Sequence, residues 1–265
     1  MNKYLISSCD ETYFNKNKNY LYSVNKNSKI QNILLCIGFL PPNAFLQQTP
    51  NIKYINIPLN QVNHDLGKHV TSRKNFLCIQ NGEFINFLPD IKDEDVIMFL
   101  DYDFIQQRQF EETELALLDS IKDNDIYMNT DGFVYNHIFS EKYIMKDVPS
   151  LKEKLKNLEK SDGIIYNTGL MIATKSTFRK IFEKYIELYP IASAHVDPNG
   201  KNHGLSQWLI NYISHSELII NKLDDTFVNA FWFTGNTCTV QNQQMYCKNK
   251  VVLFNHTKFN WETRF

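Results

Sequence analysis

Short apolar runs alternate with longer segments of helical spacing through the first hundred residues. Continuous apolar runs of this kind, bounded by polar or turn residues, are typical of strands that are covered on both faces. Alternation of strand, helix and strand favours parallel pairing and an α/β sandwich. The expected strands are Tyr4–Ser7, Ile33–Ile37, Tyr54–Ile57 and Val96–Leu100, and the expected helices are residues 13–24 and 74–88.

The second half of the chain is less regular. Because no internal repeat or Gly/Ser linker divides the chain, we expect a single domain over residues 1–265. The fold class that follows is α/β, with a mixed, mostly parallel central sheet flanked by helices and a Rossmann-like first half. The elements expected here are strands at 126–128, 164–173, 218–220 and 251–254, a helix from Ser176 to Leu188 that ends before Pro190, and a short helix from Gly204 to Tyr212.

Composition narrows the class of protein. The chain has 265 residues, of which 43% are hydrophobic, and a formal net charge of −1. This apolar share excludes a disordered polymer. The near-zero charge argues against a nucleic-acid partner, since neutralising phosphates requires a concentrated excess of Lys and Arg. No apolar run is long enough to cross a bilayer, and the N-terminal apolar stretch is too short for a signal peptide. We therefore expect a cytoplasmic protein without a membrane span.

The five cysteines are odd in number and show no C-x-x-C spacing, which argues against zinc clusters and a secreted disulfide framework. Cys238 and Cys247 lie symmetrically about Gln241–Gln244, which could form a four-residue hairpin loop and place the two cysteines across a pair of strands. The alternative is two reduced thiols in a cytosolic protein. Both interpretations are kept.

Three D-x-D tripeptides occur in the chain: Asp93–Asp95, Asp101–Asp103 and Asp123–Asp125. Since about one such match is expected by chance, context must separate them. The first and the third precede strands, where acids normally lie in solvated turns. Only Asp101–Asp103 follows directly from an apolar strand, and ligands of open α/β sheets bind just beyond the carboxyl ends of strands.

Asp101 and Asp103 can converge on one cation. Residues two apart in extended backbone project to the same side, and two adjacent carboxylates repel unless a proton or a metal lies between them. A hard divalent cation, with open positions for phosphate oxygens, suits this arrangement. The alternative is a pair of solvated acids in the turn that ends the strand.

Four stretches of the chain, Tyr4–Asp10, Val96–Asp103, Tyr166–Ile172 and Leu253–Trp261, are similar in order to four elements of a known family. These elements are a first strand with its nucleotide loop, a strand with a metal motif, an Asn-Ser/Ala-Gly strand beside the sugar, and a terminal His-x-Gly-x-x-Lys-Pro-Trp element. The chain thus resembles the GT-A-fold, metal-dependent nucleotide-sugar glycosyltransferases, especially the glycogenin and lipopolysaccharide-galactosyltransferase type. Its terminal stretch lacks the family's Gly and Pro.

The resemblance implies a metal site and a division of the domain. Residues 1–103 would be the nucleotide-binding half, and residues 104–265 would bind the acceptor and complete the metal site. His256 offers a nitrogen ligand beside Asp101 and Asp103. A mixed nitrogen and oxygen site suits Mn²⁺, with Mg²⁺ as the alternative.

The donor implied by the resemblance is a nucleotide-diphospho-sugar, UDP-linked, and the acceptor is a glycan or another hydroxyl compound. Ser8 and Asp10 are candidates to bind the base or ribose, and Asp10 is alternatively the N-cap of the following helix. Asn167 either binds sugar hydroxyls or satisfies backbone groups within its strand. The other residues expected at the donor are Arg73, Lys74 and Lys258, which can pair with diphosphate oxygens, and Tyr102 of the acidic tripeptide.

Two mechanisms of transfer follow, and retention is favoured by resemblance. The family's Gln, matched by Gln207 although Ser206 replaces the Asp before it, lies under the anomeric carbon in a retaining reaction. An inverting reaction needs a carboxylate base within hydrogen-bond reach of the acceptor, for which Asp131, Asp162 and Asp197 are the candidates. Asp131 could instead bind sugar hydroxyls or lie in a plain turn.

Two further segments have open interpretations. Phe231–Phe233 is either an apolar platform for a sugar ring or part of the core, and the polar stretch Ala194–Gly204, with its two histidines, could form a lid that excludes water. Two rival functions are also considered. A sugar nucleotidyltransferase would carry a Gly-rich basic loop after the first strand, which Ser7–Glu11 lacks, and a non-catalytic carbohydrate- or partner-binding domain would bind no nucleotide through a metal.

Overall fold

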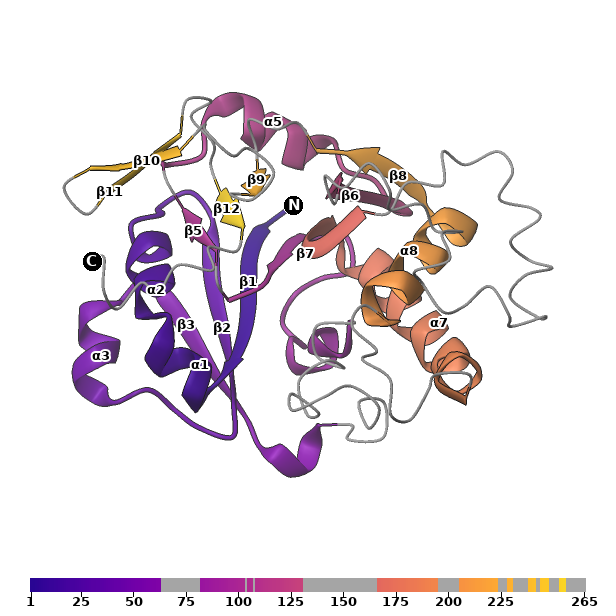
Figure 1. Ribbon diagram of the computed structural model, residues 1–265, viewed down its shortest axis with the longest axis horizontal. Helices are drawn as coiled ribbons and strands as arrows, with labels where there is room; N and C mark the ends of the chain where they lie inside the picture. The colour runs from indigo at the N-terminus through magenta and orange to yellow at the C-terminus, as the bar shows by residue number, and fades with distance from the viewer. Residues whose placement is uncertain are drawn as a thin grey trace.

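A computed structural model describes residues 1–62, 82–102, 104–106, 108–130, 166–194, 205–223, 228–230, 238–241, 244–247 and 253–255 (Figure 1). The strands are β1 (Lys3–Asp10), β2 (Gln31–Ile37), β3 (Ile52–Ile57), β4 (Val96–Leu100), β5 (Ile105–Gln106), β6 (Asp125–Thr130), β7 (Tyr166–Thr174), β8 (Ile219–Lys222), β9 (Val228–Ala230), β10 (Cys238–Gln241), β11 (Gln244–Cys247) and β12 (Leu253–Asn255). The helices are α1 (Glu11–Lys16), α2 (Lys18–Asn25), α3 (Asn43–Gln48), α5 (Glu112–Ser120), α7 (Lys175–Ala194) and α8 (Leu205–Glu217), with 3-10 helices η1 (Leu59–Gln61) and η3 (Glu83–Phe87).

A seven-stranded sheet in the order β3-β2-β1-β4-β7-β6-β8 forms the centre of the molecule. Every neighbouring pair is parallel except those of β7, which runs antiparallel to both β4 and β6. The prediction of a mixed, mostly parallel α/β sheet is therefore confirmed, and β7 supplies the antiparallel strand. All five residues of β4 are buried, as its unbroken apolar run predicts.

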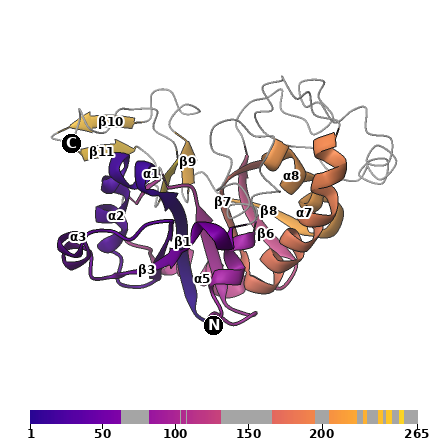
Figure 2. The same cartoon turned by 90° about the horizontal axis from the view of Figure 1, so that it is seen from below.

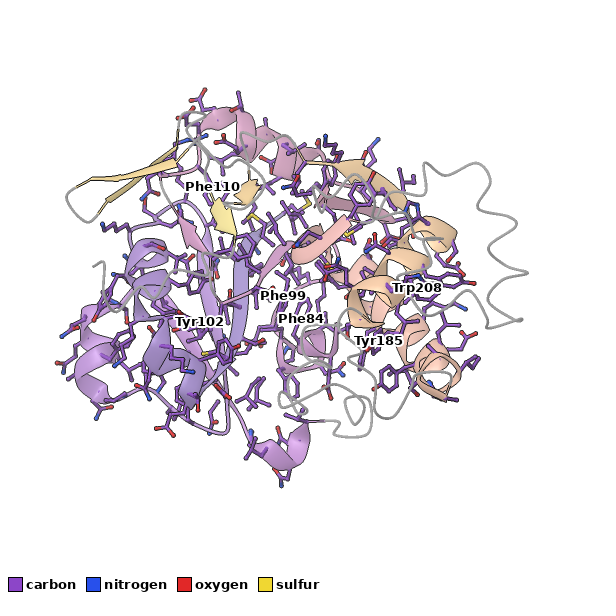
Figure 3. The ribbon with its side chains drawn as sticks, viewed as in Figure 1. Phe84, Phe99, Tyr102, Phe110, Tyr185 and Trp208 are labelled. Atoms are coloured by element: carbon purple, nitrogen blue, oxygen red, sulfur yellow. The ribbon has the colours of Figure 1, made fainter. Side chains whose placement is uncertain are left out.

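Two hydrophobic cores lie on the two faces of this sheet. One contains side chains from α1, α2, α3 and α5, and the other contains side chains from η3, α7 and α8. Figure 2 views this arrangement from below, with α1–α3 beside one half of the sheet and α7 and α8 beside the other. In the second core the ring of Phe84 stacks on Phe99 at 4.3 Å between centroids (Figure 3). Phe84 also meets Phe178 edge-on. The sheet is thus covered on both faces, which leaves its strand ends as the places where ligands can reach it.

Two smaller sheets complete the described part of the chain. β12 pairs with β9 in parallel and with β5 in antiparallel orientation. β10 and β11 form an antiparallel hairpin in which Cys238 is the backbone partner of Cys247. The predicted hairpin is confirmed, but Gln241 and Gln244 pair with each other, so the connection is shorter than the four-residue loop expected from the sequence.

Two of the helices predicted from the sequence differ from those in the structure. The helix expected over residues 13–24 is two helices, α1 and α2, because Asn17 leaves helical geometry at φ −125° and ψ 38°. Of the helix expected over 74–88, the described part is only η3, a 3-10 turn. Gly82 precedes it at φ 111°, and a Cβ there would lie 2.9 Å from the Cβ of Phe182. Glycine is required there both by the left-handed backbone and by the close approach of α7.

The helix expected to end before Pro190 instead runs through it, and α7 continues to Ala194. A proline within a helix removes one backbone hydrogen bond. Tyr189 and Ala192 lie in the same core on either side of this position. Packing of these side chains offsets the missing bond, as tertiary context commonly does for local propensity. Within the described residues, the helices are all too short or too polar to cross a membrane.

Candidate active site

The sheet has its topological switch point at β1, where successive strands are added first on one side and then on the other. The chain passes from β1 to β2 and β3 on one side, and β4 then pairs with β1 on its other side. Ligands of open α/β sheets bind at such a switch point, outside the carboxyl ends of the strands. Asp10 ends β1 and Asp101 directly follows β4. The topology therefore brings two of the predicted site residues to the ligand-binding edge of neighbouring strands.

Asp101 is held at this edge by its own backbone. Its N–H donates to the carbonyl of Gly169 on β7 at 2.8 Å, and its carbonyl accepts from the N–H of Phe104 at 3.4 Å. The chain thus turns immediately after β4 while Asp101 remains attached to β7. The side chain of Asp101 is half-buried. These two bonds use only the backbone groups of Asp101.

Asn167 lies at the same edge, because β7 runs antiparallel and begins where β4 ends. It is buried, and its Oδ1 accepts from the N–H of Gly169 at 2.7 Å. The prediction that it satisfies backbone groups within the strand is confirmed, whereas contact with a sugar remains a prediction. Gly169 thus bonds through its carbonyl to Asp101 and through its N–H to Asn167, which joins the two site residues.

Gln207 lies in the first turn of α8 with a half-buried side chain. One turn further on, the completely buried Asn211 donates from Nδ2 to the Gln207 carbonyl at 2.8 Å. The same amide group donates to the Tyr166 carbonyl at 2.8 Å, and its Oδ1 accepts from the Tyr166 N–H at 2.7 Å. Asn211 therefore links the start of α8, which carries Gln207, by hydrogen bonds to the start of β7, which carries Asn167.

Three predicted donor residues of the first half are also located. Ser8 is a buried position of β1, opposite Leu35. Asp10 is the N-cap of α1, with Oδ1 accepting from the Tyr13 N–H at 2.7 Å, so this alternative is confirmed. Tyr102 is 3% exposed and packs edge-on against Tyr20 in the core, as Figure 3 locates it. Any contact of Tyr102 with a donor would therefore involve its backbone.

β5 and β12, which border the other two metal-ligand candidates in the sequence, pair with each other. β5 begins two residues after Asp103, and β12 ends one residue before His256. The two strands are antiparallel, with Phe254 opposite Ile105. Within the described ranges no three acidic, histidine or cysteine side chains are grouped to hold a metal. Seven predicted site residues lie outside these ranges: Arg73, Lys74, Asp103, Asp131, Asp162, His256 and Lys258. Asp197, Phe231–Phe233 and most of Ala194–Gly204 do so as well.

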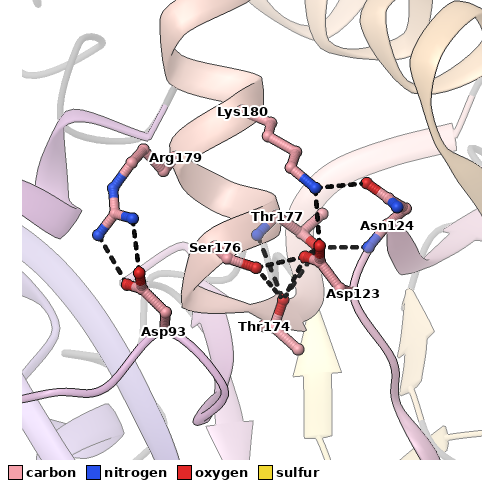
Figure 4. Close-up of polar contacts among 8 residues, drawn as sticks. All are labelled: Asp93, Asp123, Asn124, Thr174, Ser176, Thr177, Arg179 and Lys180. Atoms are coloured by element: carbon pink, nitrogen blue, oxygen red, sulfur yellow. Dashed lines mark hydrogen bonds and ion pairs between the residues drawn. The ribbon is translucent and has the colours of Figure 1, made fainter.

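The other two D-x-D tripeptides lie at the opposite edge of the sheet, where β4 and β6 begin. Asp95 accepts from the backbone N–H groups of Asn2 at 2.7 Å and Lys92 at 3.1 Å, and it is buried rather than solvated as expected. Asp93 forms a two-pronged ion pair with Arg179 at 2.7 and 2.8 Å (Figure 4). These two acids thus bind backbone groups and an arginine at the opposite edge of the sheet, away from the edge that carries Asp101.

Asp123 of the third tripeptide lies at the N-terminus of α7 (Figure 4). It accepts hydrogen bonds from Lys180 at 2.7 Å, from Ser176, and from Thr177 at 3.3 Å. The bonds from Lys180 and then Ser176 are the main causes that lower the pKa of Asp123 to about 2, against the opposing effect of desolvation. A negative charge at a helix N-terminus is also stabilised by the positive end of the helix dipole. Asp123 therefore joins the loop before β6 to side chains in the first turns of α7.

Asp123→Asn is expected to lower stability while leaving the edge near Asp101 intact. The folded-state pKa lies below the ordinary value of 3.8, so the stabilisation is complete above that value and is lost as the pH falls toward 2. Because the side chain is 52% exposed, we expect about 1 kcal/mol or less. The free energy of unfolding, measured in urea, should differ from that of the wild type by a constant amount at neutral pH. This difference should shrink as the pH falls below the ordinary pKa of an aspartate. Asp90→Asn, at an 84% exposed side chain, is the matched control, and an equal effect there would contradict the assignment.

Two site residues were not foreseen from the sequence. Asn211 interrupts the apolar run Trp208–Ile213 of α8, and Asn129 lies at the end of β6. A polar residue within an apolar helical run indicates a buried partner, but this partner, Tyr166, lies 45 positions earlier in the chain. The local pattern therefore indicates that Asn211 has a partner without identifying it.

Comparison with known proteins gives no matching family model and no matching curated protein. Among solved structures the chain is similar to mouse xyloside xylosyltransferase 1 in its apo form, with a TM-score of 0.58 and 14% identity over 97% of this chain and 98% of that one. It is similar to the galactosyltransferase LgtC in complex with donor and acceptor sugar analogues (TM-score 0.51, 14% identity, 96% and 86% covered). It is also similar to the apo form of the glycosyltransferase GlyE of Streptococcus pneumoniae TIGR4 (TM-score 0.51, 16% identity, 89% and 49% covered). The chain shares the GT-A fold of these proteins.

Proposed function

We propose that this chain is a metal-dependent glycosyltransferase that moves a sugar from a UDP-linked donor to a hydroxyl acceptor. The observation that carries the proposal is the meeting of Asp101 and Asn167 at one carboxyl edge, joined through both backbone groups of Gly169. The same edge holds Asp10 at the switch point of the sheet. The fold neighbours, described as a xylosyltransferase and a galactosyltransferase, support sugar transfer as the reaction class.

The metal would be held by Asp101, Asp103 and His256. The half-buried carboxylate of Asp101 fits such a role, and the pairing of β5 with β12 brings together the segments that border the other two ligands. A bound Mn²⁺ or Mg²⁺ would stabilise the negative charge that develops on the leaving diphosphate. Arg73, Lys74 and Lys258 are the candidates to share that charge through hydrogen bonds, and Ser8 and Asp10 are the candidates to bind the nucleoside.

Gln207 favours transfer with retention of the anomeric configuration. Its amide lies on the first turn of α8, which Asn211 fastens to β7 beside Asn167. A neutral amide can steady positive charge on the anomeric carbon without acting as a base. An inverting reaction would instead use Asp131 or Asp162 as the base. The anomeric configuration of the product, determined by NMR, distinguishes the two, and an inverted linkage would remove Gln207 from this role.

Calorimetry and thermal shift with nucleotides and metal test the proposal. UDP is expected to bind in the presence of Mn²⁺ and to bind much more weakly without it. In a panel of UDP-sugars with Mn²⁺, the correct donor should raise the melting temperature, because a ligand at about a hundred times its Kd stabilises by roughly 2.7 kcal/mol. A non-catalytic binding domain would show no metal-coupled nucleotide binding. A nucleotidyltransferase would form UDP-sugar from a sugar phosphate and UTP, and observing that reaction would overturn the proposal.

A further inference from the structure

The end of β6 carries a buried hydrogen-bond acceptor with no protein partner among the described residues. Asn129 is 8% exposed, and its Oδ1 is fully buried and accepts no hydrogen bond from any described group. Leaving such an acceptor unpaired in the interior is costly, so buried polar atoms in folded proteins nearly always have a partner. The unpaired oxygen therefore indicates a donor that binds at this place.

A bulge in the sheet places Asn129 directly opposite Asn167. Along β6 and β7 the pairing passes from Met128 opposite Met171 to Asn129 opposite Asn167, so three residues of β7 have no counterpart on β6. Bulges of this kind occur next to active sites, where they re-aim side chains. Directly paired residues of antiparallel strands project to the same face of the sheet. The two amides are therefore neighbours at the carboxyl edge.

The bulged segment also connects this amide pair to the predicted metal motif. It contains Gly169, whose carbonyl accepts from the Asp101 N–H at 2.8 Å and whose N–H donates to Asn167 Oδ1 at 2.7 Å. Because Asn167 Oδ1 is engaged by backbone, Asn129 Oδ1 is the amide oxygen of the pair that has no described donor. Asn129 lies at the same carboxyl edge, two strands from β4 and its Asp101. With the nucleoside expected at the end of β1 and the diphosphate at the end of β4, the sugar of the donor would extend toward β7 and β6.

We propose that Asn129 Oδ1 accepts a hydrogen bond from a ring hydroxyl of the donor sugar and thereby contributes to donor specificity. This inference rests on the proposed glycosyltransferase function. An acceptor oxygen in a dry site discriminates well between ligands, since a sugar that lacks the hydroxyl leaves the oxygen unpaired. Asn129 acts on the sugar alone, so its contribution should be absent from the binding of UDP.

Asn129→Leu tests the proposal, because leucine has a similar shape and no acceptor. The readout is the ratio of the Kd of UDP to the Kd of the best-binding UDP-sugar of the panel, both with Mn²⁺. We expect this ratio to fall about tenfold, the scale of one buried hydrogen bond, with the Kd of UDP unchanged. The melting temperature of the ligand-free variant should rise, since an unpaired buried oxygen is removed. Asn221→Leu is the control, since Asn221 lies on β8 with its Nδ2 donating to the Ile219 carbonyl at 3.3 Å.

The possible results separate the two proposals. If wild-type protein binds UDP and Mn²⁺ but Asn129→Leu keeps the wild-type ratio, the assignment of Asn129 is wrong and the proposed function stands. A lowered melting temperature would also overturn it, because Asn129 would then be bonded within the protein. A higher KM for the acceptor with an unchanged ratio would assign Asn129 to the acceptor instead and overturn the donor contact. If wild-type protein binds no UDP with Mn²⁺, the proposed function itself fails.

Discussion

Asp101→Asn should abolish metal-dependent sugar transfer while the protein remains folded. The amide keeps the size of the side chain but loses the charge that holds a cation, and removing one group that stabilises developing charge typically costs about 100-fold to 1000-fold in kcat. The backbone bonds of Asp101 to Gly169 and Phe104 do not use the carboxylate, so the turn is retained. The measurement is kcat at saturating donor across a Mn²⁺ titration, with the melting temperature as the test of folding.

Asp93→Asn is the matched control, because Asp93 belongs to a D-x-D tripeptide at the other edge of the sheet and pairs with Arg179. We expect it to keep wild-type kcat. Full metal-dependent activity in Asp101→Asn, or an equal loss in both variants, would show that the metal motif is misplaced.

Asn211→Leu should impair both stability and transfer. The substitution leaves the N–H and the carbonyl of Tyr166 without their partner in a buried place, and each such group costs about 1–3 kcal/mol. The melting temperature should fall by roughly 2 °C or more for each kcal/mol lost. Since α8 would no longer be fastened to β7, Gln207 would shift relative to Asn167. We therefore expect kcat to fall at temperatures at which the variant is fully folded, with the Kd of UDP nearly unchanged.

Two comparisons make this result interpretable. Asn221→Leu replaces an asparagine of β8, the strand that follows α8, and should change neither property. A variant that destabilises to the same extent elsewhere, such as Phe178→Ala in the core beneath η3, should keep its kcat when folded. If both Asn211→Leu and Phe178→Ala keep wild-type kcat, then Asn211 stabilises the fold without positioning Gln207.

The sequence predicted most strands because each is an unbroken local pattern. The run of β4 and the acids after it are visible without any tertiary information, and the structure places Asp101 at the sheet edge as expected. The differences arise where distant contacts outweigh local preference. Pro190 lies inside α7 because core packing on both sides holds the helix together. Asp95 is buried because the backbone of Asn2, 93 positions away, donates to it.

The same reason explains what was missed in the site. Asn211 has its partner 45 positions away, and Asn129 faces Asn167 only because of a bulge that no local pattern encodes. Tyr102 is in the metal motif by sequence, yet its ring packs against Tyr20 in the core. The motifs therefore predicted which sheet edge carries Asp101 and Asn167, whereas the contacts of Asn211 and Asn129 with neighbouring strands became visible only in three dimensions.

A crystal structure of the protein soaked with MnCl₂ and UDP would examine the central claim most directly. The account predicts an anomalous manganese peak bonded to the Asp101 carboxylate, with the diphosphate of UDP on the same ion and the nucleoside beside the end of β1. Full-occupancy UDP elsewhere on the molecule, or an edge of the sheet without manganese at millimolar concentration, would contradict it.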